Sequence, residues 1–594
     1  MKLFQESTYI PFTKSTNYID NLLSSNEYEK IYIDFEKCIV EINKKIDKIF
    51  FKKKFNYASK YFVVIEPHLV AFNLLTKAII IDKIISRKKS NKIIVEIYDE
   101  ELSKDFYYRF INLYELIVRK IGHPFKIINR GKANIYYKND PSSKSKFLNL
   151  FNFNYKILAY EILKRNLKFN SKKKILKIGQ NYITREIEFE LFKCGIGTLP
   201  VKNELRTTFD NLLSDSYTYG KYETIYKIVK MELDKLKHKF FNNTKVYNAY
   251  TCVLSDIINS NIVDLFSKKD LMRKKIYDYK KQINFNLCLS NGLFGLFGKS
   301  TYDALSYNGI EVISAEHGLT VGNSRDSLQY FFANESLTSN RLLCYSKASK
   351  ITHKKNKNSN LKLDVVGAPQ FPKILKYRSF KKFVLKKKFN LSGINVIYIS
   401  HNIELNPGKY FPYTKTNPEI FNDELSLLST LGKINKNVIY KSYPTMQYLM
   451  DKNEILNNYI KKFENIKIFK GEEDFRYIRS IADIIITQSS ESTLEWCIGA
   501  NVPLIFLDSD FYEPLENENV KKAFKDSFFF INYDKVGWKK QLTDFLNLPY
   551  EDILRKWNEK EIYRKNYDDK YFLSSKKYAG SIGSKLILNL IDGN

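Results

Sequence analysis

The stretch IADIIITQSSESTLEWCIGANVPLIFLD, residues 481–508, decides the fold class. It contains an apolar run at 482–487, then Ser- and Thr-rich residues that open a helical pattern, and a second apolar run at 502–508. Short β-branched runs joined by a helical segment are typical of buried parallel strands with a crossover helix. The stretch therefore predicts an α/β unit built on a parallel sheet.

The same alternation of apolar runs and helical patterns extends over most of the chain. Runs of strand character occur in both halves of the sequence, at 60–66, 92–99, 125–131, 173–178, 284–291, 310–315, 341–346, 362–366, 395–400, 436–441 and 464–470. Helical patterns lie between many of them, and such an order predicts doubly wound parallel sheets in each half.

Changes in composition along the chain suggest its domain organisation. The predicted units are an N-terminal extension (1–55), an N-terminal Rossmann-like domain (56–375) with a basic helical insertion (about 203–281), a Lys-rich linker (376–393), a C-terminal Rossmann-like domain (394–550) and a helical tail (551–594). A chain of 594 residues is long enough for two to four domains at about 150 residues each.

The chain is strongly basic, with a formal net charge of +32. Three explanations are open: the drift that an AT-rich genome imposes, a basic face for anionic lipid or phosphorylated ligands, and nucleic-acid binding. The basic residues are spread along the chain and do not gather in one tail. This spread disfavours nucleic acid as a partner.

Cysteine spacing and apolar content bear on the compartment. None of the six cysteines forms a C-x-x-C pair, so we expect neither a zinc knuckle nor a redox dithiol. The start, MKLFQESTYIPF, lacks an apolar signal core, and the most apolar long stretch (61–85) carries several charged side chains. We expect a cytoplasmic protein, and leave open an association with the inner face of the cytoplasmic membrane.

The first candidate site follows the apolar run 310–315. Glu316, His317 and Gly318 stand at the carboxyl end of this predicted strand, where open parallel sheets bind their ligands. His317 is a candidate general base or phosphate-oxygen donor, and Glu316 is a candidate to orient the imidazole or to take the proton itself. Gly318 permits a close approach of the backbone to a ligand. The alternative is an ordinary strand-end histidine.

The second candidate site follows the run 482–487. Its polar residues, which surround the predicted start of a helix, are Gln488, Ser489, Ser490, Glu491, Ser492, Thr493 and Glu495. Hydroxyls and free backbone N–H groups at a helix N-terminus bind anions, so a nucleotide phosphate fits there. Glu495 is placed to accept from ribose hydroxyls. The alternative is simple N-capping by one serine.

Two further strand ends carry candidate residues. Lys441 ends a strand and precedes Tyr443 and Pro444, which places a cation at the carboxyl edge of the second sheet. The alternative is a solvated lysine before a turn. Gly367 follows another strand and is a candidate for backbone approach to a ligand, or simply for a tight loop.

The sequence favours no metal site. Asp508 and Asp510 form a D-x-D pair, which can hold Mg²⁺ or Mn²⁺, but two carboxylates in a loop are common. We interpret them as loop residues and expect metal-independent chemistry without a cofactor.

Taken together, VISAEHG (312–318), LLCYSKASK (342–350), VVGAP (365–369) and the opening stretch (481–508) resemble one group of enzymes. The group is the GT-B glycosyltransferases, and more narrowly the bacterial capsule and surface-polysaccharide transferases, which include Kdo-type transferases, polysialyltransferase-like enzymes and polyol-phosphate polymerases. The resemblance spans roughly residues 280–510.

This resemblance implies two Rossmann-like domains that face each other across a cleft. It implies that Ser489, Ser490 and Ser492 contact the donor phosphate. CMP-sugar-using relatives carry a His-Pro pair where this chain has Tyr443 and Pro444. The donor nucleotide, CMP or UDP, therefore stays open. Glu316 stands where Gln is common in relatives, which supplies an extra acid or base.

The expected function is glycosyl transfer from a nucleotide-sugar to a growing surface polysaccharide or lipid-linked glycan. The alternatives are a polyol-phosphate (CDP-glycerol-type) transferase, a sugar-nucleotide epimerase, and a non-enzymatic polyanion- or RNA-binding protein. The expected partners are the nucleotide-sugar, the glycan acceptor and an anionic membrane surface, and no nucleic acid is expected.

Overall fold

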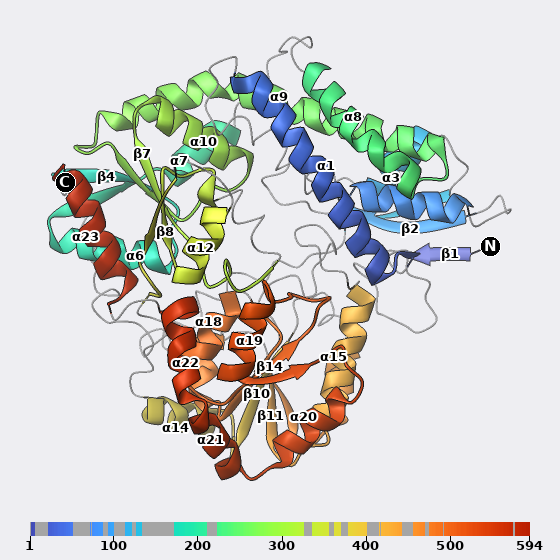
Figure 1. The fold of residues 1–594 in the computed structure, drawn as a ribbon, viewed down its shortest axis with the longest axis vertical. Coiled ribbons are helices and arrows are strands. Elements are labelled where there is room, and N and C mark those ends of the chain that lie inside the picture. The colour runs from blue at the N-terminus through green and yellow to red at the C-terminus, as the bar shows by residue number, and fades with distance from the viewer. Residues whose placement is uncertain are drawn as a thin grey trace.

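The structure is a computed structural model, drawn in Figure 1. It describes residues 2–5, 22–51, 72, 74–86, 93–99, 113–121, 126–132, 172–210, 223–325, 335–355, 361–369, 378–400, 415, 417–441, 455–469, 475–490, 492–573 and 577–593. The predicted strand at 60–66 lies outside these residues.

The C-terminal lobe contains a six-stranded parallel sheet in the order β12-β11-β10-β13-β14-β15. Its strands are β10 (Asn395–Ile399), β11 (Asn437–Lys441), β12 (Ile466–Phe469), β13 (Ile484–Thr487), β14 (Leu504–Asp508) and β15 (Phe529–Asn532). Renumbered from the first strand of the lobe, the order is 3-2-1-4-5-6, which is the Rossmann arrangement.

Both faces of this sheet are covered by helices, which explains why its strands are apolar almost without interruption. The helices are α14 (Arg378–Lys388), α15 (Asn417–Leu431), α16 (Ile455–Ile460), α17 (Phe475–Ile478) with the 3₁₀ turn η6 (Arg479–Ile481), α18 (Ser492–Gly499), α19 (Glu518–Ser527), α20 (Trp538–Asn547) and α21 (Tyr550–Glu559).

The N-terminal lobe has a second six-stranded parallel sheet, in the order β5-β4-β6-β7-β8-β9. Its strands are β4 (Lys173–Ile178), β5 (Ile196–Pro200), β6 (Leu287–Ser290), β7 (Glu311–Ala315), β8 (Arg341–Cys344) and β9 (Lys362–Val365). The helices beside it include α6 (Tyr182–Lys193), α7 (Lys202–Asp210), α10 (Gly295–Tyr307) and α12 (Lys347–Lys355). The predicted α/β fold with two Rossmann-like parallel sheets is confirmed.

A third unit precedes these two lobes in the chain. It contains a parallel three-stranded sheet of β1 (Lys2–Gln5), β2 (Ile93–Asp99) and β3 (Lys126–Lys132), with α1 (Ser25–Phe51) and α3 (Leu113–Ile121). Sequence reasoning assigned the strands before and after residue 150 to one domain, whereas the structure divides them between two sheets. Strand periodicity cannot reveal this division, because it reports burial and not the sheet to which a strand belongs.

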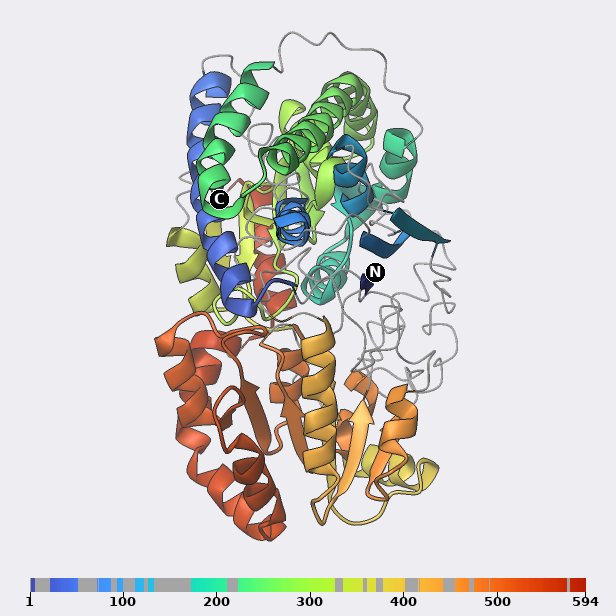
Figure 2. The same ribbon diagram turned by 90° about the vertical axis from the view of Figure 1, so that its right-hand side faces the viewer.

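The basic helical stretch 203–281 connects the third unit to the N-terminal lobe. Its main helices are α8 (Glu223–Phe240), which packs on α1, and the long α9 (Thr244–Lys280). The first turns of α9 bury Tyr250 in the core of the third unit, and its last turns bury Ile276 against the N-terminal lobe. Figures 1 and 2 show α9 running between the two bodies. The predicted helical character is confirmed for the described parts of this stretch, which form α7, α8 and α9.

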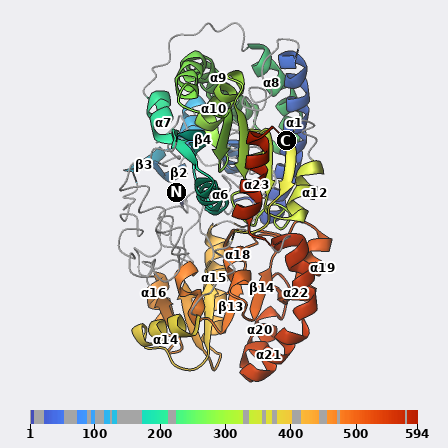
Figure 3. The ribbon, with the colours of Figure 1, turned by 90° about the vertical axis from the view of Figure 1, so that its left-hand side faces the viewer.

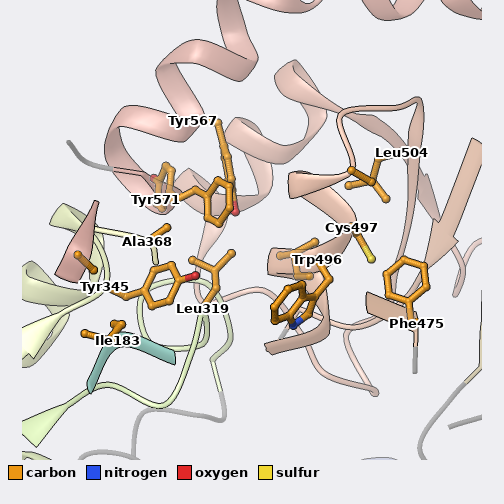
Figure 4. Packing of buried hydrophobic residues seen from close by; sticks show 14 of the residues in the cluster. Ile183, Leu319, Tyr345, Ala368, Phe475, Trp496, Cys497, Leu504, Tyr567 and Tyr571 are labelled. Atoms are coloured by element: carbon orange, nitrogen blue, oxygen red, sulfur yellow. The ribbon is translucent and has the colours of Figure 1, made fainter. Parts of the chain in front are cut away.

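The two lobes share a continuous apolar core. In Figure 4, Leu319, Tyr345 and Ala368 of the N-terminal lobe lie beside Trp496 and Tyr571 of the C-terminal lobe. Because such a core is closely packed, it fixes the position of one sheet's carboxyl edge relative to that of the other.

The predicted helical tail consists of α21 and α22 (Glu561–Tyr567), a π-helical segment (Asp568–Phe572) and α23 (Ala579–Ile591). The chain crosses back in this tail, so that α23 lies on α6 of the N-terminal lobe (Figure 3). A Cβ atom at Gly580 would lie 2.5 Å from Glu186 Cβ and 2.9 Å from its backbone carbonyl carbon, so glycine at this position permits the close packing.

The structure contains no disulfide, because all six cysteines are free thiols. Within the described ranges, none of the helices combines the length and the apolar character that a membrane span requires.

Candidate functional site

Both large sheets have a point at which the strand order reverses, and ligands of open parallel sheets bind beyond the strand ends at such a point. In the N-terminal lobe the reversal lies between β4 and β6, and in the C-terminal lobe it lies between β10 and β13. The residues after β13 are those of the predicted Ser-rich site, and β7, which precedes His317, is the strand next to β6.

The structure brings the two predicted sites into contact. A Cβ atom at Gly318 would lie only 3.2 Å from Ser492 Cβ and 3.5 Å from Glu495 Oε2. The loop after β7 therefore lies against the first turn of α18, in the other lobe. An aromatic contact also joins the two lobes: the ring of Tyr182, at the start of α6, meets that of Trp496 of α18 edge to face, with 5.2 Å between centroids. We call the loop 316–318 together with residues 488–495 the interlobe site.

His317 is the exposed titratable group of the loop 316–318. Its ring lies beside Phe294, with 6.4 Å between centroids in an edge-to-face arrangement. Surrounding protein removes part of its hydration, and this burial lowers the pKa of the imidazole below the usual 6.5. The imidazole is therefore mostly neutral at pH 7, the form that a general base requires.

The backbone of His317 is held by a buried acid. The His317 N–H donates to Glu335 Oε1 at 2.8 Å, and Glu335 Oε2 has no hydrogen-bond partner among the described residues. Burial raises the pKa of Glu335 well above its usual value, and the nearby Glu316 raises it further. We infer that Glu335 is a neutral carboxylic acid that fixes the loop beneath the imidazole.

Glu335→Gln should improve stability selectively at higher pH. Because the folded-state pKa of Glu335 is raised, its contribution to the free energy of unfolding is fully present below its unfolded-state pKa and is lost as pH rises towards the folded-state pKa. Glutamine is uncharged at every pH in this range. The melting temperature of the variant, relative to that of the wild type, should therefore increase from pH 5 to pH 8. The exposed Glu518→Gln is the matched control and should show no such trend. Parallel pH dependence in wild type and Glu335→Gln would contradict a neutral Glu335.

Glu316 is not placed to orient the His317 imidazole or to take a proton, as the sequence suggested. Its side chain is fully buried, accepts from the Tyr345 N–H and from Ser349 Oγ (3.0 Å), and lies 2.8 Å from His353 Nε2. These partners hold the segment after β8 to the loop after β7. The side chain at 316 points into the protein because it alternates with the outward-facing His317, and we therefore assign Glu316 a structural role.

The serines after β13 divide into two groups. Ser490 is buried, donates its N–H to Glu513 Oε2 at 3.1 Å and donates its hydroxyl to the Glu513 carbonyl at 2.8 Å. Ser489, Ser492 and Thr493 are half-buried at the start of α18. Backbone N–H groups in a helix's first turn have no acceptor within the helix, so this turn offers donors to an anion.

Glu495 and Gln488 are both buried within this region. Glu495 interacts with Tyr345 of the N-terminal lobe, and burial together with Glu495 raises the pKa of the Tyr345 hydroxyl well above its usual value. Glu495 thus contributes to the contact between lobes. Gln488 Nε2 has no hydrogen-bond partner among the described residues, which makes it a candidate donor to a ligand.

The remaining predicted residues have different outcomes. Lys441 is fully buried at the end of β11, with Nζ 5.9 Å from the centroid of the Phe469 ring. Tyr443 and Pro444 lie outside the described residues. Gly367 follows β9 in a buried turn with φ of 81°, a conformation that favours glycine.

The D-x-D pair lies beside a lysine. Lys521 Nζ is 3.6 Å from Asp508 Oδ2 and also pairs with Asp510, while burial raises the pKa of Asp508 to about 6. In the described part of the chain, no cluster of three or more His, Cys, Asp or Glu side chains has the arrangement of a metal site. Metal-independent chemistry stays a prediction.

Sequence reasoning missed several residues at these strand ends. Asn181 caps α6 and donates from Nδ2 to the Glu316 carbonyl at 2.8 Å. Asn291, after β6, approaches Gly179 so closely that a Cβ there would lie 1.8 Å from Asn291 Oδ1. Asn and Gly directly after apolar runs were the available signal for these positions. Glu335 had none, because it lies far along the chain from His317.

Comparisons with known proteins found matches among solved structures alone. No protein-family model matches the sequence, and no curated protein matches it. Among solved structures, a glycosyltransferase from Rickettsia africae aligns with a TM-score of 0.40 and 14% identity, over 72% of this chain and 100% of its own.

Two other solved structures align to a similar extent. UDP-GlcNAc 2-epimerase from Neisseria meningitidis, bound to UDP-GlcNAc, gives a TM-score of 0.40 and 14% identity, over 71% of this chain and 100% of its own. The Anabaena protein HepE, in complex with UDP and glucose, gives 0.39 and 9%, also over 71% and 100%.

Proposed function

We propose that this chain is a nucleotide-sugar-dependent glycosyltransferase that acts across the interlobe site. The observation that carries the proposal is the contact between Gly318 and Ser492. It brings the neutral, exposed imidazole of one lobe beside the start of α18 on the other lobe, which is the proposed phosphate site. Glycosyl transfer requires both a base and a stabilised leaving phosphate.

Each element has a defined part in the proposed reaction. His317 takes the proton from the acceptor hydroxyl, whose oxygen then forms a bond to the anomeric carbon of the sugar. The bond between that carbon and the phosphate of the nucleotide breaks, and the electron pair leaves with the phosphate oxygen. Backbone N–H groups in the first turn of α18, with the hydroxyls of Ser489 and Ser492, stabilise the departing charge.

The proposed acceptor is a growing surface polysaccharide or a lipid-linked glycan, available at the inner face of the cytoplasmic membrane. This part rests on the sequence resemblance over residues 280–510 to capsule and surface-polysaccharide transferases. The first property to determine is the identity of the donor nucleotide, UDP or CMP.

A thermal-shift screen with UDP, CMP, GDP and CDP tests donor binding and separates the serines. A bound nucleotide raises the melting temperature, because stability grows with ligand concentration over Kd. We expect Ser489→Ala with Ser492→Ala to weaken nucleotide binding at least about a hundredfold, since two charge-assisted hydrogen bonds are lost at ~1.5–3 kcal/mol each and about 1.4 kcal/mol is a factor of ten. Ser490→Ala, the matched control, should leave Kd unchanged and cost about 1–2 kcal/mol of stability, because its partners lie within the protein.

Product analysis decides between activities. A stabilising nucleotide is then supplied as its sugar conjugate together with a glycan acceptor. A labelled sugar in the glycan supports the proposal. An isomerised nucleotide-sugar formed without acceptor identifies an epimerase, and transfer of labelled glycerol phosphate from CDP-glycerol identifies a polyol-phosphate transferase. No stabilisation by any nucleotide, with salt-sensitive RNA binding, would identify a polyanion-binding protein.

A further inference from the structure

Helix α14 (Arg378–Lys388), in the predicted linker, turns an apolar face to solvent. Phe380 is 55% exposed, Phe383 is 67% exposed and Val384 is 39% exposed. Residues at i, i+3 and i+4 lie on the same face of a helix, so the three side chains form one stripe. Single exposed apolar residues are ordinary, whereas a contiguous exposed stripe marks an interaction surface.

The opposite face of α14 fixes this orientation. Leu385 is buried, and Lys382 forms an ion pair with Asp483 of the C-terminal lobe. Lys386 Nζ lies 3.8 Å from Asp483 Oδ2 and donates to the Gly393 carbonyl at 2.8 Å. The helix also packs on the turn η6. The apolar stripe is therefore held outward by contacts made on the inner face.

The chain segment that carries the stripe has only positive charges. Seven of the thirteen residues 376–388, KYRSFKKFVLKKK, are Lys or Arg, and none is acidic. Lys387, one turn beyond Phe383, is exposed. Lys467 of β12, also exposed, reaches the end of the helix region, where its Nζ donates to the Asn390 carbonyl at 2.8 Å.

Aromatic side chains combined with lysines suit an anionic lipid surface. Phenylalanine partitions into the boundary between headgroups and acyl chains, and lysines next to it are attracted to anionic headgroups. The cores of protein–protein interfaces are instead depleted of lysine. Figures 1 and 3 place α14 on the outside of the C-terminal lobe, where a lipid surface can reach it.

We propose that the outward face of α14, formed by Phe380, Phe383, Val384 and Lys387, binds an anionic lipid membrane. The two phenylalanines insert at the headgroup boundary, and the exposed Lys387 pairs with lipid phosphates. This inference goes beyond the proposed glycosyl transfer and does not depend on it.

Co-sedimentation of the full chain with vesicles tests the proposal. We expect binding to vesicles of phosphatidylcholine mixed with phosphatidylglycerol, and much weaker binding to phosphatidylcholine alone. Phe380→Ser with Phe383→Ser should lower the partition coefficient at least about tenfold, because burying a phenylalanine contributes that much. Lys387→Glu should lower it by about fivefold or more. Val536→Ser, which removes a fully exposed apolar side chain in the lysine-flanked turn before α20, is the matched control and should bind like the wild type.

The proposal fails if the wild type binds neither vesicle, if it binds both equally, or if the double phenylalanine variant binds like the wild type. Both phenylalanines are exposed, so the double variant should melt at the wild-type temperature. If it melts lower, the single variant Phe383→Ser replaces it in the vesicle experiment. A different outcome is that the wild type does not bind vesicles but forms an oligomer, and that the double variant does not form this oligomer. The stripe is then a protein interface, and the lipid proposal is overturned.

Discussion

Replacing His317 by alanine is expected to lower kcat of glycosyl transfer by about 10² to 10⁴-fold, the usual contribution of a general base. The imidazole is exposed and meets the start of α18 through the adjacent Gly318, so its loss removes chemistry and little packing. The melting temperature and the nucleotide Kd should therefore stay close to those of the wild type. Steady-state kinetics, with thermal melts and nucleotide titration on the same preparation, provide the measurement.

The pH profile adds a readout that a structural role would not change. Because the pKa of His317 is lowered, the acidic limb of kcat/KM should fall below pH 6.5 and should be absent from the residual activity of the alanine variant. Wild-type turnover in His317→Ala would remove the imidazole from the mechanism. An unaltered acidic limb in that variant would assign the limb to another group.

Replacing Glu316 by alanine is expected to cost about 3 kcal/mol or more of folding free energy, because each buried donor left without an acceptor costs about 1–3 kcal/mol. The carboxylate accepts from the Tyr345 N–H and Ser349 and meets His353, and all three partners are buried. Its removal leaves buried donors without acceptors, and such groups keep their full desolvation penalty. Urea unfolding followed by circular dichroism measures the loss.

Glu316→Gln provides the comparison, since it keeps the size and one acceptor oxygen and should lose clearly less stability than the alanine variant. If Glu316→Ala folded with wild-type stability but lost turnover, Glu316 would be the acid or base that its sequence position first suggested. His317→Ala is thus expected to lose turnover and keep its stability, whereas Glu316→Ala is expected to lose stability, although the two residues are neighbours in the chain.

Local sequence was sufficient for the fold class. The run 484–487 became β13, and the Ser-rich residues after it began α18, because an apolar run and a polar helix start are properties of adjacent residues. The same reasoning placed His317 at a strand end. It also identified 203–281 as helical, and both lobes have the parallel order that the alternation indicated.

Local sequence was insufficient where partners lie far apart in the chain. Nothing near Lys2–Gln5 indicated that it pairs with Ile93–Asp99 in a separate sheet. Nothing near His317 indicated Glu335, and the Ser-rich pattern did not distinguish the half-buried Ser489 from Ser490, whose hydroxyl donates to the Glu513 carbonyl. Hydrogen-bond partners of this kind are set by packing, which periodicity does not encode.

The sequence by itself determined two parallel α/β sheets, each with polar residues at its strand ends, because strand periodicity and helix starts are set by neighbouring residues. Only the tertiary structure decided that Gly318 touches Ser492, that Glu316 points inward while His317 points outward, and that α14 exposes its phenylalanines. The physical reason is that these three features depend on how separate elements pack, and packing joins residues that are distant in the chain.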